Sequence, residues 1–280
     1  MKTTLSIEGT QHPTITPKLS ELYKQLFNLI PENLDKSKFA KFFPMVGTKY
    51  KKSSPKIMLV GRCPNGWRGF EDNETIDSFV SSAADQMVSE DGFNWINKDN
   101  HISEYTITQD GKTTTEQYNI NSSAFWRVTK SVVYKCKPWL EEHKKLGVEL
   151  TQDHIKGIDN NITCWFEHIV WTNIFPIAPL NGGNTSEKLK RITKNVCADL
   201  LLEQIKFYKP THIIFITDWD YWFSDIAEKF PNVKKISENS NDNIVGLGEI
   251  DGVKTIVTRR PETRGNEEMA EDIFESLFNN

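Results

Sequence analysis

Short runs of apolar residues that end abruptly at a glycine or a polar residue are the main pattern of this sequence. Such runs cover residues 56–60, 167–172 and 212–217, and a fourth ends at Arg259. Unbroken apolar runs of this length are typical of strands that are buried on both faces of a parallel sheet. The residues that follow such strands lie at the carboxyl edge of the sheet, where α/β proteins bind ligands. We therefore expect one sheet with its functional residues gathered at that edge.

Apolar residues at helical spacing separate the runs. They predict helices over residues 17–31, about 75–88, 122–133 with a serine cap, 186–208 and 265–278. A further helix is expected after the third run, capped by Asp218 and burying Trp222, Phe223, Ile226 and Phe230. Strands that alternate with helices predict a three-layer α/β/α fold around a central four-stranded, mainly parallel sheet. We expect residues 1–280 to form a single α/β domain.

Residues 91–121 interrupt this alternation and are interpreted as an insertion. Residues 104–108 and 112–119 alternate and are rich in threonine, and Asp110-Gly111 between them is a hairpin signal. The insertion is either a surface excursion or a lid over the site. A second hairpin is expected over 244–257, with Asp251-Gly252 at its turn.

Composition excludes several classes of protein. The net charge of −4 gives no overall attraction to nucleic acid, so any such contact has to come from a local basic edge. The four cysteines include no C-x-x-C pair, and the six histidines have no metal-ligand spacing, so we expect no metal, no cofactor and no disulfide framework. No apolar run has the length of a membrane span, and no signal core is present. A cytoplasmic protein without a membrane partner is expected.

The loop after the first run combines turn residues, cations and an aromatic residue. Its small and turn-forming residues allow a ligand to approach the backbone closely, Arg62 and Arg68 can hold an anion, and Trp67 can stack on a planar group. Cys63 is either a nucleophile activated by Arg62 or a small buried thiol. The candidate binding residues of this loop are Gly61, Pro64, Asn65, Gly66, Trp67 and Arg68.

Two later run ends supply further candidates. Asn173 carries an amide that offers both a donor and an acceptor, which suits the edge of a nucleobase or a turn, and Phe175 can stack on a base or belong to the core. Arg259, Arg260 and Arg264 precede the last helix, and arginines ahead of a helix form an anion site or a solvated basic loop.

In their order along the chain, these motifs resemble those of the uracil-DNA glycosylase superfamily. The segments that carry the resemblance are Val60-Gly61-Arg62-Cys63-Pro64-Asn65-Gly66, Phe125-Trp126-Arg127-Val128, Thr172-Asn173-Ile174-Phe175-Pro176, Lys209-Pro210-Thr211-His212 and Arg259-Arg260-Pro261-Glu262. The resemblance covers residues 56–278. It implies a pocket for a flipped base, a DNA strand held by loops, and an Asn173 that reads the pyrimidine edge.

The sequence departs from the family at the positions that activate water. Cys63 stands where many members have Asp or Asn, and Arg260 replaces a histidine. An arginine stabilises an anion but stays protonated, so it is a poor general base. If the protein hydrolyses an N-glycosidic bond in DNA, Arg62, Cys63 and Arg260 are the catalytic candidates. Two other hypotheses stay open, a non-catalytic sensor of a nucleotide or another phosphorylated ligand, and a cysteine-dependent hydrolase at Cys63.

Overall fold

The computed structural model describes most of the α/β core of the chain. The described residues are 15–31, 38–64, 75, 77–78, 102–109, 112–119, 122–136, 165–180, 182–237, 242–262 and 265–278. Most of the helix expected near 75–88 lies outside them, as do residues 137–164.

A seven-stranded sheet forms the centre of the molecule, in the order β2-β6-β3-β8-β11-β10-β9. Its four middle strands are parallel, as the sequence predicts. They are β6 (Ile169–Asn173), β3 (Ile57–Gly61), β8 (His212–Ile216) and β11 (Val253–Thr258). Antiparallel strands extend both sides, namely β2 (Met45–Val46), β10 (Ile244–Ile250) and β9 (Lys234–Lys235). The sheet is therefore wider than the four strands expected from the sequence, and β11 is an interior strand.

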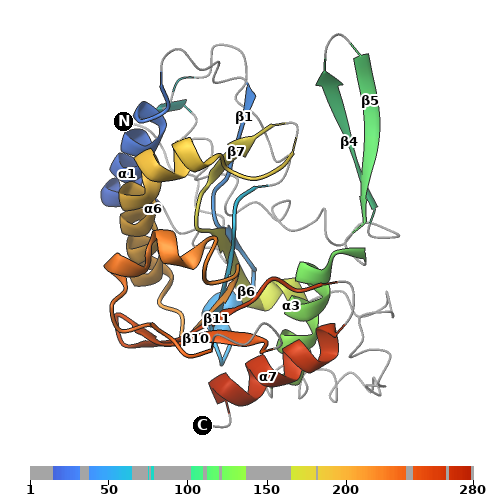
Figure 1. The fold of residues 1–280 in the computed structure, drawn as a ribbon, viewed down its shortest axis with the longest axis vertical. Helices are drawn as coiled ribbons and strands as arrows, with labels where there is room; N and C mark the ends of the chain where they lie inside the picture. The colour runs from blue at the N-terminus through green and yellow to red at the C-terminus, as the bar shows by residue number, and fades with distance from the viewer. Residues whose placement is uncertain are drawn as a thin grey trace, which may run out of the picture.

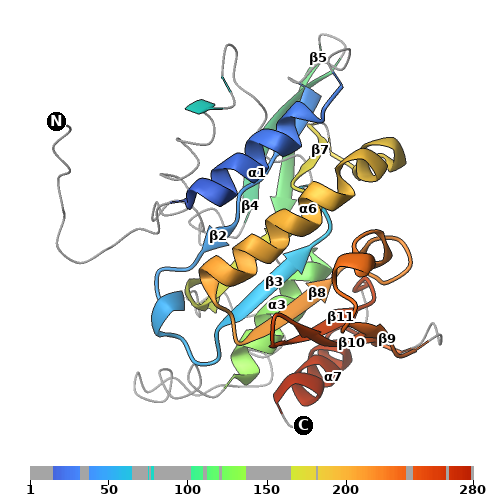
Figure 2. The same ribbon diagram turned by 90° about the vertical axis from the view of Figure 1, so that its left-hand side faces the viewer.

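Helices cover both faces of the sheet (Figures 1 and 2). On one face lie α1 (Pro17–Asn28) and α6 (Glu187–Tyr208), and on the other lie α3 (Ala124–Lys135) and α7 (Asn266–Phe278). Side chains alternate between the two layers along each strand. In β3, for example, Val60 packs in the core under α1 and α6, whereas Leu59 packs in the core under α3. The expected three-layer α/β arrangement is therefore present.

The ends of the helices follow their sequence signals, with one exception. The Thr16 hydroxyl accepts a hydrogen bond from Leu19 N at 3.1 Å, and the Ser186 hydroxyl accepts one from Leu189 N at 3.3 Å. Each bond satisfies a donor that the first turn of a helix leaves free. Ser123 occupies the cap position of α3, but its side chain makes no capping bond. A serine therefore precedes that helix, as predicted, but it does not cap the helix through its side chain.

The predicted helix after β8 is wrong. Residues 218–233 are all described, and their helical segments are the two 3₁₀ turns Phe223–Asp225 and Ala227–Lys229. Asp218 does not cap a helix. It adopts a left-handed conformation with φ of 85°, and its Oδ1 accepts a hydrogen bond from Asp220 N at 3.3 Å. The expected burial is correct, because Trp222, Phe223, Ile226 and Phe230 are all in the core.

Both predicted hairpins form. Strands β4 (Ile102–Gln109) and β5 (Lys112–Asn119) pair antiparallel with Gln109 opposite Lys112, and they stand apart from the layers in Figure 1. Strands β10 and β11 are joined by Asp251 and Gly252, both with positive φ. A separate two-stranded sheet joins β1 (Phe39–Lys41) to β7 (Ile177–Pro179). Among the helices that the structure describes, none has the length and apolar character to cross a membrane.

Candidate functional site

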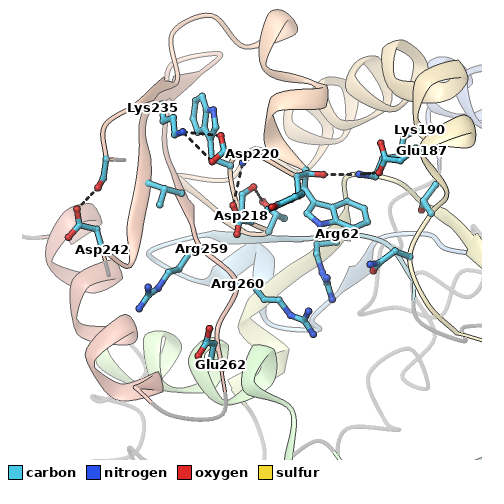
Figure 3. Close-up of a pocket in the computed structure, with 18 residues that line it drawn as sticks. Arg62, Glu187, Lys190, Asp218, Asp220, Lys235, Asp242, Arg259, Arg260 and Glu262 are labelled. Carbon is cyan, nitrogen blue, oxygen red and sulfur yellow. Dashed lines mark hydrogen bonds and ion pairs between the residues drawn. The ribbon is translucent and has the colours of Figure 1, made fainter. Parts of the chain in front are cut away.

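A cavity of about 590 Å³ lies where β3, β8 and β11 end (Figure 3). Arg62 contributes from the end of β3, residues 217–222 from the loop after β8, and Arg259, Arg260 and Glu262 from the segment after β11. The amino-terminal turn of α6 and the surroundings of β9 complete the walls. The cavity therefore occupies the carboxyl edge of the sheet, as expected from the pattern of apolar runs.

Two arginines face each other in this cavity. Figure 3 shows Arg260 extending toward Arg62, whose guanidinium carbon lies 5.4 Å from the centre of the Trp222 ring. Burial lowers the pKa of Arg62, and the positive charge of Arg260 lowers it further. Neither arginine forms an ion pair with an acidic residue in the described part of the chain. Two guanidinium groups held together without a carboxylate between them form an attractive site for an anion.

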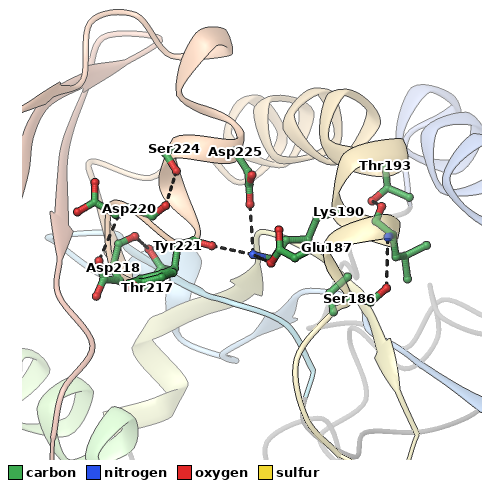
Figure 4. A network of polar contacts seen from close by, with 12 residues as sticks. Ser186, Glu187, Lys190, Thr193, Thr217, Asp218, Asp220, Tyr221, Ser224 and Asp225 are labelled. Atoms are coloured by element: carbon green, nitrogen blue, oxygen red, sulfur yellow. Dashed lines mark hydrogen bonds and ion pairs between the residues drawn. The ribbon is translucent and has the colours of Figure 1, made fainter.

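Lys190 is a cavity residue that sequence reasoning missed. Its side chain is 5% exposed, and its ammonium lies 2.9 Å from Glu187 Oε1 and 3.4 Å from Asp225 Oδ2. It also donates to the Tyr221 carbonyl at 2.7 Å, as Figure 4 shows, and lies 4.1 Å from the centre of the Trp222 ring. Lys190 therefore ties the loop after β8 to α6. Its position on the buried stripe of α6, three residues before Thr193, was the available signal.

The acidic residues of the cavity differ in their pairing. Asp220 forms an ion pair with Lys235 at 2.9 Å. Asp218 lines the same cavity, forms no ion pair with a cation in the described segments, and uses only Oδ1 in its bond to Asp220 N. The negative charge of Asp218 acts on Arg62 and raises its pKa, although burial outweighs this effect. The cavity thus offers both guanidinium donors and a carboxylate acceptor.

Asn173 lies at the same edge of the sheet but not in this cavity. It is opposite Gly61 in the β3–β6 pairing and is 4% exposed. A methyl group on Gly61 would lie 2.5 Å from Asn173 Oδ1 and 3.4 Å from Trp171 Nε1, so the amide lies over Gly61 on the face that Trp171 occupies. That is the α3 face, whereas Trp222, whose ring Arg62 contacts, belongs to the core on the α6 face. The Asn173 amide and the Arg62 side chain therefore lie toward opposite faces at this edge of the sheet.

The Asn173 amide has an unusual environment. Its Nδ2 is buried and has no hydrogen-bond partner within the segments that the structure describes. A buried donor without a partner costs free energy, and such a group in a folded protein calls for an explanation. A ligand that accepts a hydrogen bond would satisfy it.

The remaining predicted residues are placed as follows. Cys63 Sγ lies 3.8 Å from the Gly183 carbonyl oxygen, and burial raises the pKa of the Cys63 thiol. Phe175 is 1% exposed and packs against Trp222 in the core, so it offers no free face for stacking. Pro64 is also buried. Arg259 Nε donates to Asn243 Oδ1 at 3.3 Å. Asn65, Gly66, Trp67, Arg68 and Arg264 lie outside the described residues.

No group of three or more His, Cys, Asp or Glu side chains in the described part of the chain could hold a metal ion. No protein-family model matches the sequence, and no curated protein matches it.

Proposed function

We propose that this protein binds a nucleotide or a nucleic-acid strand at the carboxyl edge of its sheet, with Arg62 and Arg260 holding a phosphate group. The observation that carries the proposal is the pair of guanidinium groups in one cavity, with no carboxylate paired to either in the described residues. A phosphate accepts hydrogen bonds from both groups and removes their mutual repulsion. The Trp222 ring supports Arg62 from one side, so this arginine is held in place before a ligand arrives.

The uracil-DNA glycosylase-like reading adds a base-recognition role for Asn173. Asn173 ends β6, and the resemblance assigns base recognition to the residue at this strand end. The role is supported by the buried Asn173 Nδ2, which has no hydrogen-bond partner among the described residues. Because Asn173 and Arg62 lie on opposite faces at the same edge, a strand would cross that edge with a phosphate on the α6 face and a base on the α3 face.

Hydrolysis of an N-glycosidic bond would depend on electrostatic stabilisation in this protein. The departing base carries negative charge, and the positive charges of Arg62 and Arg260 lower the energy of that state. Neither arginine can take a proton from water. A glycosylase of this kind is therefore expected to be slow, and a non-catalytic sensor of nucleotides on the same fold is the alternative.

The binding proposal is tested by calorimetric titration of the protein with mononucleotides and with single-stranded and double-stranded oligonucleotides. We expect Arg62→Gln and Arg260→Gln each to weaken binding about tenfold, because each removes a charge-assisted hydrogen bond. Arg191→Gln is the matched control, since Arg191 is exposed on α6 and does not line the cavity. Equal affinity of all four proteins would refute the phosphate assignment.

The glycosylase reading needs its own assay. Uracil-containing oligonucleotides are incubated with wild-type protein and with Asn173→Ala, and cleavage is followed after alkaline treatment. We expect activity that Asn173→Ala abolishes. Cleavage that persists in Asn173→Ala eliminates Asn173 as the base reader, and nucleotide binding without any cleavage favours the sensor.

A further inference from the structure

We infer that the same cavity recognises a nucleobase at Tyr221 and Asp218, and that it prefers bases with an exocyclic amino group. The inference rests on the proposed phosphate site and deepens it by naming the class of base bound beside that phosphate, at a place separate from Asn173. It concerns the loop after β8, for which the sequence predicts a helix capped by Asp218.

Among the described residues that line the cavity, Tyr221 is the most exposed large hydrophobic one. It is 74% exposed and lines the cavity, while its neighbour Trp222 is 5% exposed. Single exposed aromatic residues are common on protein surfaces, so the exposure of Tyr221 alone does not indicate a binding site. The main chain of Tyr221, however, is fixed by the 2.7 Å bond from buried Lys190 to its carbonyl oxygen. An aromatic side chain on an anchored backbone loses little freedom when a base stacks on it, and this favours binding.

Asp218 supplies the specificity. Its Oδ1 is occupied by the Asp220 N–H group, and within the described residues it pairs with no cation. Its Oδ2 is therefore the acceptor that remains for a ligand. A carboxylate accepts a hydrogen bond from the amino group of cytosine, whereas the carbonyl oxygen of uracil at the same place would repel it.

The two halves of the cavity select one class of ligand together. Arg62 and Arg260 bind a phosphate, and Tyr221 and Asp218 bind a planar ring with an N–H donor at its edge. Inorganic phosphate and ribose phosphate satisfy only the first half, and uridine monophosphate satisfies the second half poorly. Cytidine monophosphate satisfies both halves and is the simplest probe.

The test is calorimetric titration of the full chain with cytidine monophosphate, uridine monophosphate and ribose phosphate. Wild-type protein is expected to bind cytidine monophosphate several-fold more tightly than uridine monophosphate, and both more tightly than ribose phosphate. Tyr221→Ala should weaken both nucleotides about tenfold and leave ribose phosphate unchanged. Tyr221→Phe, which keeps the ring, should bind like wild type.

Asp218→Asn is the decisive variant. Asparagine tolerates the left-handed backbone at this position, keeps Oδ1 for the Asp220 N–H group, and places a donor where Oδ2 was. The preference should therefore invert toward uridine monophosphate. An unchanged preference, or equal affinity of wild type for all three ligands, overturns the inference.

If Arg62→Gln weakens all three ligands equally while Tyr221→Ala changes none, the phosphate site stands and the base site is wrong. If Arg62→Gln and Arg260→Gln change nothing, the phosphate site is wrong. If none of the three ligands binds wild-type protein while an oligonucleotide does, the inference is wrong and strand binding stands. If the oligonucleotide does not bind either, both proposals are wrong.

Discussion

Gly61 and Asn173 lie opposite each other in the β3–β6 ladder, and the Asn173 amide covers the α-carbon of Gly61 so closely that a methyl group there would be 2.5 Å from Oδ1. Only glycine leaves room for the amide in this position. The glycine that ends the first apolar run therefore makes room for the Asn173 side chain, which belongs to a strand more than one hundred residues later in the chain.

Gly61→Ala is expected to lower the free energy of unfolding by about 1–3 kcal/mol, because the added methyl displaces the Asn173 amide in a packed region. Urea denaturation measures the change. In an Asn173→Ala background most of this cost should vanish, since the atom that clashes is gone. A cost that is the same in both backgrounds would show that the backbone, and not Asn173, limits the size of residue 61.

Asn173→Ala alone is expected to change the free energy of unfolding by less than about 1 kcal/mol although the residue is buried. The lost packing is offset by removal of a buried donor that lacks a described partner. Thr172→Val is the contrasting variant, because the Thr172 hydroxyl donates to Gln204 Oε1 at 2.8 Å and leaves that acceptor unsatisfied when removed. We expect Thr172→Val to cost about 1–2 kcal/mol in the same urea assay.

Lys190→Met is expected to lower the free energy of unfolding by about 2 kcal/mol, because it leaves the half-buried Asp225 carboxylate without its cation and frees the Tyr221 carbonyl. Lys229→Met is the control, since the Lys229–Asp199 pair is exposed and should contribute less than about 0.5 kcal/mol. Thermal denaturation compares the two variants. Equal losses would mean that the burial of Lys190 adds nothing to its contribution.

Cys63 is expected to alkylate slowly at neutral pH. Burial raises the pKa of the Cys63 thiol, so the thiolate that reacts with iodoacetamide is scarce until the pH approaches that raised value. Arg62→Gln should slow the reaction further, because the positive charge of Arg62 acts to lower this pKa. Peptide mass spectrometry follows modification at Cys63, with denatured protein as the reference. Alkylation as fast as in the denatured chain would restore the nucleophile hypothesis.

His212 should make the protein less stable in mild acid. Burial and the nearby Lys254 ammonium lower the pKa of His212 below its usual value near 6.5, and the Leu277 backbone opposes them. The unfolded chain therefore takes up a proton first as the pH falls through about 6.5, and the free energy of unfolding decreases until the lower folded pKa is passed. His212→Gln should flatten this dependence between pH 7 and 5 in urea titrations. An unchanged slope would assign the effect to other groups.

The sheet could be predicted from the sequence because its central strands are buried on both faces. Apart from His212 at the amino end, the strands Ile57–Gly61 and His212–Ile216 contain only apolar residues and glycine. Such an unbroken apolar run is typical of a strand with both faces buried. The antiparallel strands β2 and β9 are two residues long, and so short a segment carries no pattern. The helix predicted after β8 is wrong because residues 222, 223, 226 and 230 have helical spacing, but two successive 3₁₀ turns bury the same residues.

The sequence predicted where the site lies, but not which of its side chains share one cavity. The rule that ligands bind beyond the carboxyl ends of strands located Arg62, Arg260 and Asn173 at one edge. Which face each side chain occupies depends on the alternation within the strand, and Asn173 shares its face with Trp171, not with Thr172. Tyr221 and Lys190 carried no motif, since their roles follow from a contact between two segments that are remote in the chain.

The tight turn at Asp251 and Gly252 is a suitable place for attaching a tag. It precedes β11, whose six residues place it roughly 20 Å from the cavity at the other end of the strand. Both turn residues are exposed, and the surroundings of Gly252 are open, although its φ of 76° disfavours a side chain at that residue itself. An affinity tag or a fluorescent reporter peptide inserted at this turn would leave the ligand-facing edge clear, and surface-immobilised protein would present that edge to solution.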